Sequence, residues 1–231
     1  MSKLNPQKYF PTRQFIAAFA FAICTVWTQA GDWPQWRGPT WNGVAPHADP
    51  PITWSDTENL RWKTPVEGAG WGSPVVWGDR IFLLTAIPLD KKMPIPDVIP
   101  AGIAAMKQHR DAVGSWKAMR FAIVCLNRIT YMFLWSRTIQ EAMPHQGHHR
   151  KAGFASESPV TDGQHIYAYF GSFGLHCYDR EGRFVWKKEF EAQPIKYGVG
   201  EGSSPALFED TLVIVVDTER QSYVVAIDKR S

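Results

Sequence analysis

Hydrophobic and polar residues alternate most regularly in the stretch Ala155–Trp186, where four short apolar runs are separated by turn residues. The run that follows Asp162-Gly163 alternates with a period of two, which is typical of a β-strand that buries one face. Asp-Gly is itself a strong hairpin signal. The four runs begin at Val160, His165, Leu175 and Phe184. The pattern predicts a four-stranded antiparallel meander of the size of one β-propeller blade.

The same pattern occurs three times along the chain. Each copy has Ser-Pro, then a turn and a hydrophobic strand, and the copies begin at Ser73, Ser158 and Ser204. The later halves of the copies also match one another, at residues 122–127, 174–179 and 223–228. The second and third serines are 46 residues apart, which suits one blade. The third copy is partial, because it reaches only the turn after Asp228.

The first copy is longer than the others, because 85 residues separate Ser73 from Ser158. The excess is predicted to be an insertion at about 87–120, between the second and third strands of that blade. Four prolines make its first half irregular. Ala101–Val113 is predicted to form a short helix, because its apolar residues share one helical face.

Two further segments precede the first copy. Leu60–Thr64, with Trp62 at its centre, is predicted to be an outer blade strand that comes before its own blade. Residues 33–43 contain three Trp, two Pro and two Gly and suit no regular element. They are predicted to form an extended arm whose indoles pack on the domain surface. The alternative is an exposed aromatic platform for stacking a sugar or a quinone.

Residues 1–30 are predicted to be a secretory signal peptide. They combine a basic start, an apolar run of 13 residues from Phe15 to Trp27, and small residues before a cleavage site at Ala30. The apolar run is short for a bilayer span. The alternative is a lipoprotein acylated at Cys24, although Ile23 before it is not the small residue expected there. Residues 31–231 are then the exported domain, periplasmic or extracellular, without a transmembrane segment.

The signal peptide also explains the net charge of the chain. The whole sequence has 25 basic and 22 acidic residues, and the first 30 residues hold three of the basic ones and none of the acidic ones. Subtraction leaves 22 of each sign, so the exported domain is formally neutral. We therefore expect no nucleic acid as a partner.

The repeat resembles the PQQ-like (pyrroloquinoline quinone) β-propeller family. The pattern is Ser-Pro-Val, then Asp-Gly, a strand, and an Asp, Gly and Trp around the last turn. The residues that carry it are Ser158, Pro159, Asp162, Gly163, Asp179, Gly182 and Trp186, with Ser73, Pro74, Trp135, Ser204, Pro205 and Asp228 at matching positions. The resemblance covers residues 33–229 and implies an exported propeller.

For the fold, the resemblance implies an all-β, partial β-propeller with about three four-stranded blades in an open arc. Because the family usually has seven or eight blades, the chain is expected to be an N-terminal fragment. Trp62, Trp135 and Trp186 are the residues that would dock one blade on the next. One turn departs from the family pattern, because Tyr131 stands where a Gly is preferred, in a position that strains a side chain.

For function, the family includes non-catalytic propellers such as BamB and also quinoprotein dehydrogenases. The first implies a binding or assembly scaffold, whose partners are other envelope proteins or further blades. The second implies oxidation of alcohols or polyols with PQQ and calcium. Trp71, Glu157 and Glu201 precede the Ser-Pro motifs and are the candidates for a cofactor site at the channel mouth. The chain lacks the vicinal cysteine pair expected beneath a bound quinone.

Two smaller clusters complete the candidate chemistry. His145, His148 and His149 form a dense histidine group that suits a transition metal, or else an exposed loop between blades. Cys125 and Cys177 occupy one position in successive repeats, where the third copy has Ala226. That pattern favours a packed core position, and the alternative is a disulfide that bridges two blades.

Overall fold

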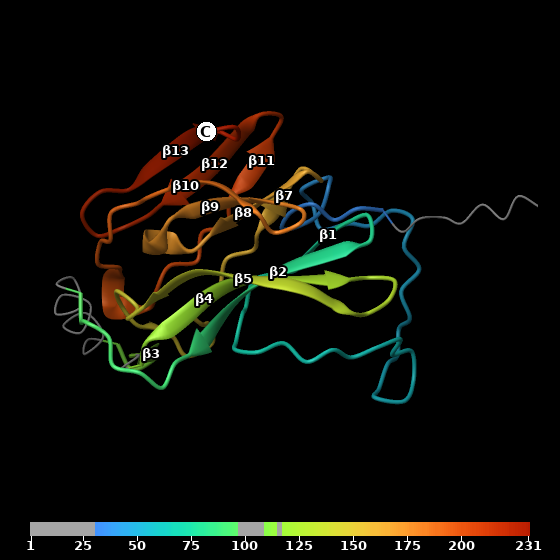
Figure 1. The fold of residues 1–231 in the computed structure, drawn as a ribbon, viewed down its shortest axis with the longest axis horizontal. Coiled ribbons are helices and arrows are strands. Elements are labelled where there is room, and N and C mark those ends of the chain that lie inside the picture. Colours follow the sequence, from blue (N-terminus) through green and yellow to red (C-terminus); the bar gives the residue numbers. More distant parts are fainter. Residues whose placement is uncertain (1–30, 97–108, 115–116) are drawn as a thin grey trace, which may run out of the picture.

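The computed structural model describes residues 31–96, 109–114 and 117–231. The predicted signal peptide and most of the predicted helix lie outside these residues. Figure 1 shows successive twisted β-sheets that lie side by side, with the C-terminal strands at one end of the stack. The helical elements of the described residues are two short 3-10 turns, η1 (Gly171–Phe173) and η2 (Lys196–Gly198). The fold is all-β, a partial β-propeller, as predicted.

Blade 1 is a four-stranded antiparallel sheet with the order β1-β2-β4-β5. Its strands are β1 (Val75–Trp77), β2 (Arg80–Pro88), β4 (Met119–Asn127) and β5 (Phe133–Ala142). The insertion lies between the second and third strands of this blade, as the spacing of the repeats predicts. It contains β3 (Ala112–Val113), which pairs with β6 (His148–His149). The last residues of the predicted helix, Ala112–Val113, are therefore a strand, because they pair with a strand outside the insertion.

Blade 2 has the order β10-β9-β8-β7, which is four consecutive strands in a meander. Its strands are β7 (Val160–Thr161), β8 (His165–Tyr169), β9 (Leu175–Asp179) and β10 (Phe184–Lys188). The first turn forms as its sequence predicts, because the Asp162 carboxylate accepts hydrogen bonds from the backbone N–H groups of Gln164 and His165. The meander predicted from the alternation of residues is therefore confirmed.

Blade 3 has three strands in the described chain, in the order β11-β12-β13. They are β11 (Ala206–Phe208), β12 (Thr211–Val216) and β13 (Tyr223–Asp228). The fourth, outer strand that β5 and β10 provide in the other two blades has no counterpart here among the described residues. Among the described residues, β13 is therefore paired on one side, with β12.

The prediction of a strand at Leu60–Thr64 is wrong for this structure. These residues belong to no sheet. Thr64 donates from Oγ1 to the backbone carbonyl of Tyr131, in the turn before β5. The ring of Trp62 instead stacks on Tyr131 in the β4–β5 turn, with ring centroids 5.4 Å apart. Tyr131 has a φ of 65°, in the left-handed region that favours glycine. This strain is expected at a turn position where the family pattern has Gly.

Two apolar clusters join the blades. The first lies between blades 1 and 2 and includes Phe82, Phe121, Cys125 and Ile166. The second lies between blades 2 and 3 and includes Tyr167, Tyr169, Leu175, Cys177 and Leu212. Cys125 and Cys177 are both free and buried, each in its own cluster. Blade 2 therefore contacts a neighbour with each face of its sheet, and the two cysteines are packing residues.

The serines of the Ser-Pro motifs form hydrogen bonds between successive blades. The backbone N–H of Ser73 donates to Oγ of Ser158 at 2.8 Å, and the N–H of Ser158 donates to Oγ of Ser204 at 2.9 Å. Ser158 and Ser204 thus each accept a bond from the preceding blade. These bonds tie together the segments that lead into β1, β7 and β11, the first strand of each blade, on the inner side of the arc.

The arm at the start of the described chain also joins the three blades. Trp33 forms two backbone hydrogen bonds with Val76 in β1, at 2.8 and 2.9 Å. The carbonyl of Pro34 accepts from the N–H of Thr161 in β7, and the buried Gln35 side chain accepts from a backbone N–H of β11. Figure 1 shows this arm in blue beside β1 and β7. The arm therefore spans the first strands of all three blades.

Candidate functional site

Glu157 and Glu201 line one small pocket beside η1. They lie in the loops that lead into β7 and β11, so the repeat brings them to equivalent places in blades 2 and 3. The pocket has a volume of about 40 Å³. Its wall also includes Phe121, Phe170, Phe173, His145 and Gln146. Two carboxyl groups therefore share a small, largely aromatic pocket.

Glu157 is the most buried charged residue of this pocket. Its side chain is 3% exposed, and Oε2 has no hydrogen-bond partner in the described part of the chain. Burial is the main cause that raises the pKa of Glu157 to about 8, and the nearby charge of Glu201 raises it further. At neutral pH the protonated form of Glu157 therefore predominates.

Glu201 is held by two donors from neighbouring loops. The backbone N–H of Ser172 donates to Oε2 at 2.5 Å, and Nε2 of Gln146 donates to Oε1 at 3.3 Å. Burial raises the pKa of Glu201 to about 7, against the opposing effect of these hydrogen bonds. A side chain on Gly171 would overlap the Glu201 carboxylate, so this close approach needs a glycine there.

Of the three candidate histidines, only His145 lines this pocket. Its Nδ1 lies 2.7 Å from Oγ of Ser172, its ring stacks on Phe173, and burial lowers its pKa. His148 directs Nδ1 at the backbone carbonyl of His149, and Nδ1 of His149 accepts from the N–H of Lys151. The described residues contain no group of three His, Cys, Asp or Glu side chains that suits a metal ion. The histidine cluster is thus split among separate local contacts.

Trp71 does not join the two carboxylates. It is 60% exposed and lies against Gly153, and its backbone N–H donates to the carbonyl of Ala155. A neighbouring hollow of about 270 Å³, between blades 2 and 3, is lined by Glu201 but by neither Trp71 nor Glu157. The three residues predicted to hold a cofactor therefore do not surround one cavity.

The described residues do not fit PQQ with calcium. A pocket of about 40 Å³ holds a water molecule, whereas small-molecule sites usually measure about 300–1,000 Å³. Calcium needs about six to eight oxygen ligands, and no group of three His, Cys, Asp or Glu side chains in the described residues suits a metal ion. The two buried carboxyl groups, whose pKa values are raised, can instead hold protons near neutral pH.

The open face of blade 3 is the second candidate site. Alternate residues of this blade pack against blade 2, among them Leu212, Ile214 and Ile227. The opposite face carries large apolar side chains that remain exposed: Phe208 (65%), Val215 (50%) and Val224 (66%). Val215 and Val224 are cross-strand partners, so two of the three adjoin. Exposed apolar patches of this kind mark interaction surfaces.

The repeat indicates what this face is suited for. Cys125 and Cys177 are 0% exposed, each on the face of its blade that packs against the next blade. Ala226 occupies the same place in blade 3, yet it is exposed. The exposed face of blade 3 is therefore the one with which blades 1 and 2 dock their successors.

Two of the three candidate docking tryptophans lie at blade junctions. The indole N–H of Trp135 in β5 donates to the carbonyl of Arg180 in blade 2, at 3.2 Å. Trp186 in β10 repeats this contact with the carbonyl of Lys229, just after β13, at 3.1 Å. A Cβ on Gly182 would lie 2.8 Å from the Trp135 ring, which explains the glycine in that turn. Trp62 makes its ring contact with Tyr131 instead.

Three comparisons with known proteins were made. No family model matches the chain, and no curated protein matches it. Among solved structures, the chain is similar to the crystal structure of BamB from Moraxella catarrhalis, with 17% identity and a TM-score of 0.27. The similarity covers 45% of this chain and 25% of that chain. Separately, no helix in the described residues is long and apolar enough to cross a membrane.

Proposed function

We propose that this chain is an exported, non-catalytic β-propeller scaffold that binds polypeptide through the exposed apolar face of blade 3. The observation that carries the proposal is the group of exposed apolar side chains around Val215 and Val224. Contiguous exposed apolar side chains mark protein-binding surfaces.

Blades 1 and 2 support this proposal, because they show what a completed blade contains. Each has a fourth strand with a tryptophan, Trp135 or Trp186, that is opposite a buried cysteine. Blade 3 has the same inner three strands and the same apolar face but no fourth strand among the described residues. The proposal does not extend to alcohol oxidation, since Trp71, Glu157 and Glu201 surround no common cavity.

A photo-crosslinking amino acid at Val224 tests this function in the exporting cell. Because the side chain is 66% exposed on the apolar face, irradiation is expected to give adducts with polypeptide, which mass spectrometry identifies. The control places the same group at the exposed loop residue Lys151, where we expect few adducts. Equal yields at the two positions, or none at Val224, would contradict the proposed binding surface.

A further inference from the structure

We propose that the pocket beside η1 and the adjoining hollow between blades 2 and 3 bind a primary alkylammonium ion. The ammonium group lies in the pocket that Glu157 and Glu201 line, and the carbon chain lies in the hollow. This small-molecule site goes beyond the proposed function, because Val224, the residue that tests the polypeptide-binding face, lines neither cavity.

Glu157 is buried without a counter-charge. Its Oε2 atom has no hydrogen-bond partner in the described residues, although the side chain is almost wholly buried. No Lys or Arg of the described residues lines the pocket, whereas Glu201 adds a second carboxyl group to it. A buried polar oxygen without a donor is costly, and a ligand that carries N–H groups removes this cost. The pocket therefore lacks what an ammonium group supplies, a hydrogen-bond donor and a positive charge.

The aromatic wall of the pocket also suits an organic cation. Four phenylalanines line it: Phe121, Phe154, Phe170 and Phe173. An aromatic ring attracts a cation to its face, and an apolar wall strengthens the attraction between the cation and a carboxylate because it excludes water. A metal ion fits less well, since the described residues contain no group of three His, Cys, Asp or Glu side chains that could hold one.

The hollow beside the pocket has room for the carbon chain. The two cavities adjoin, because both are lined by Ser172, Gly200 and Glu201. The hollow has a volume of about 270 Å³, which suits a short aliphatic chain. Its wall combines two carboxylates, Glu191 and Asp217, with apolar side chains, and again no Lys or Arg of the described residues lines it. The apolar ones are Tyr169, Phe190, Ile195, Val215 and Val216.

The titratable groups around the pocket decide the pH at which it binds a cation. Burial raises the pKa of Glu157 to about 8 and that of Glu201 to about 7, so both carboxyl groups are charged above pH 8. An alkylamine, like a lysine side chain, keeps its proton up to a pH of about 10. Burial lowers the pKa of His145, and burial with the charges of Glu201 and Glu157 raises that of Tyr169, so both rings stay neutral there. Below pH 7 the carboxyl groups must release protons before the ammonium ion binds, and affinity therefore falls.

Isothermal titration calorimetry of the full chain with n-butylamine as the probe tests the site. We expect one molecule to bind at pH 8.5, and an affinity about tenfold weaker or less at pH 6, because both carboxyl groups then hold protons. Methylamine keeps the charge without the chain and is expected to bind more weakly than n-butylamine. The neutral 1-butanol and potassium chloride are expected not to bind. Equal binding of 1-butanol, or of potassium, would overturn the inference.

Glu157→Gln is the variant that tests the role of the unpaired carboxylate. Glutamine has nearly the size of the protonated glutamic acid and carries no charge, so the affinity for n-butylamine at pH 8.5 is expected to fall about tenfold or more. Circular dichroism of the same samples shows that the variant is folded.

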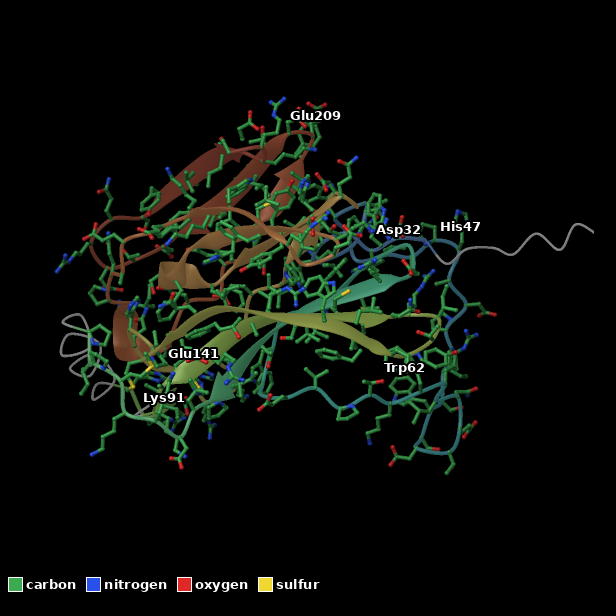
Figure 2. All side chains as sticks on the ribbon, in the orientation of Figure 1. Asp32, His47, Trp62, Lys91, Glu141 and Glu209 are labelled. Atoms are coloured by element: carbon green, nitrogen blue, oxygen red, sulfur yellow. The ribbon has the colours of Figure 1, made fainter. Side chains whose placement is uncertain are left out.

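Glu209→Gln is the matched control. Glu209 is exposed in the β11–β12 turn, lines neither cavity, and lies at the outer end of blade 3 (Figure 2), so we expect unchanged affinity. An unchanged affinity in Glu157→Gln, or no binding of n-butylamine to the wild type at pH 8.5, would overturn the inference. Neither outcome alters the crosslinks expected at Val224, so a failure here is distinct from a failure of the proposed function.

Discussion

Replacing Trp135 with alanine is expected to lower the free energy of unfolding by about 3–5 kcal/mol, the usual range for a buried tryptophan. The side chain is only 8% exposed, and its indole lies on the turn of blade 2 that contains Arg180 and Gly182. Removing it leaves a cavity at the junction of two blades and takes away one of the two side-chain donors to the Arg180 carbonyl, so that the Arg80 guanidinium alone remains. Urea titration followed by circular dichroism measures the loss.

Two matched variants separate the contribution of the hydrogen bond from that of the buried indole. Trp135→Phe keeps most of the apolar area and removes the donor, so we expect a smaller loss of about 1 kcal/mol from the hydrogen bond. Trp54→Ala alters an indole that is 76% exposed, and it should change stability by no more than about 0.5 kcal/mol. If Trp135→Ala were no more destabilising than Trp54→Ala, the indole would not be holding the two blades together.

Glu157→Gln is expected to make the chain more stable than the wild type above pH 8 and to leave it nearly unchanged at pH 5. The folded pKa of Glu157 is raised from 4.5 to about 8. Between these values the folded chain keeps a proton that the unfolded chain has released, so the stability of the wild type falls as pH rises. With about 1.4 kcal/mol for each pKa unit, the loss across this window is about 3–5 kcal/mol. A glutamine side chain stays neutral at every pH, so Glu157→Gln does not show this loss of stability.

The measurement is the free energy of unfolding at several pH values from 5 to 9, for the variant and the wild type together. Glu201, with a pKa raised to about 7, adds a slope of the same sign that ends near pH 7, and this slope remains in Glu157→Gln. Glu209→Gln changes an exposed carboxylate and serves as the control. Parallel curves for Glu157→Gln and the wild type would show that Glu157 is not buried as described.

The blades were predictable where local chemistry decides the structure. Asp162-Gly163 closes a hairpin through its own side chain, and the alternation after it sets which residues face blade 1 and which face blade 3. Repetition then extended the same prediction to β11–β13, because the strands recur at matching places. The position of the insertion followed from spacing alone.

Predictions failed where a structure depends on a distant partner. Leu60–Thr64 has residues typical of a strand, but Trp62 and Thr64 contact Tyr131 in the β4–β5 turn, and the segment pairs with no strand among the described residues. Ala112–Val113 was assigned to a helix by its apolar spacing, and it pairs with His148–His149 instead. In both cases the pattern of residues did not show which other segment of the chain lies beside the element.

The candidate site was predictable only in part. That Glu157 and Glu201 lie at equivalent points follows from their places before Ser-Pro motifs, but their common pocket depends on side chains such as Phe121 from another blade. The serine-to-backbone bonds had a visible signal, since Ser73, Ser158 and Ser204 recur as often as the blades do. The exposed face of blade 3 also had a signal in the sequence. Ala226 occupies the repeat position that the buried Cys125 and Cys177 occupy in blades 1 and 2.

Amide hydrogen exchange along β13, followed residue by residue by NMR, tests the central claim most directly. The claim is that β13 joins blade 3 through β12 and leaves the face with Val224 and Ala226 accessible. It predicts that the N–H groups of Val225 and Ile227, which point at β12, are protected, whereas those of Val224 and Ala226, which point away from β12, exchange quickly. Equal protection at all four residues would contradict it.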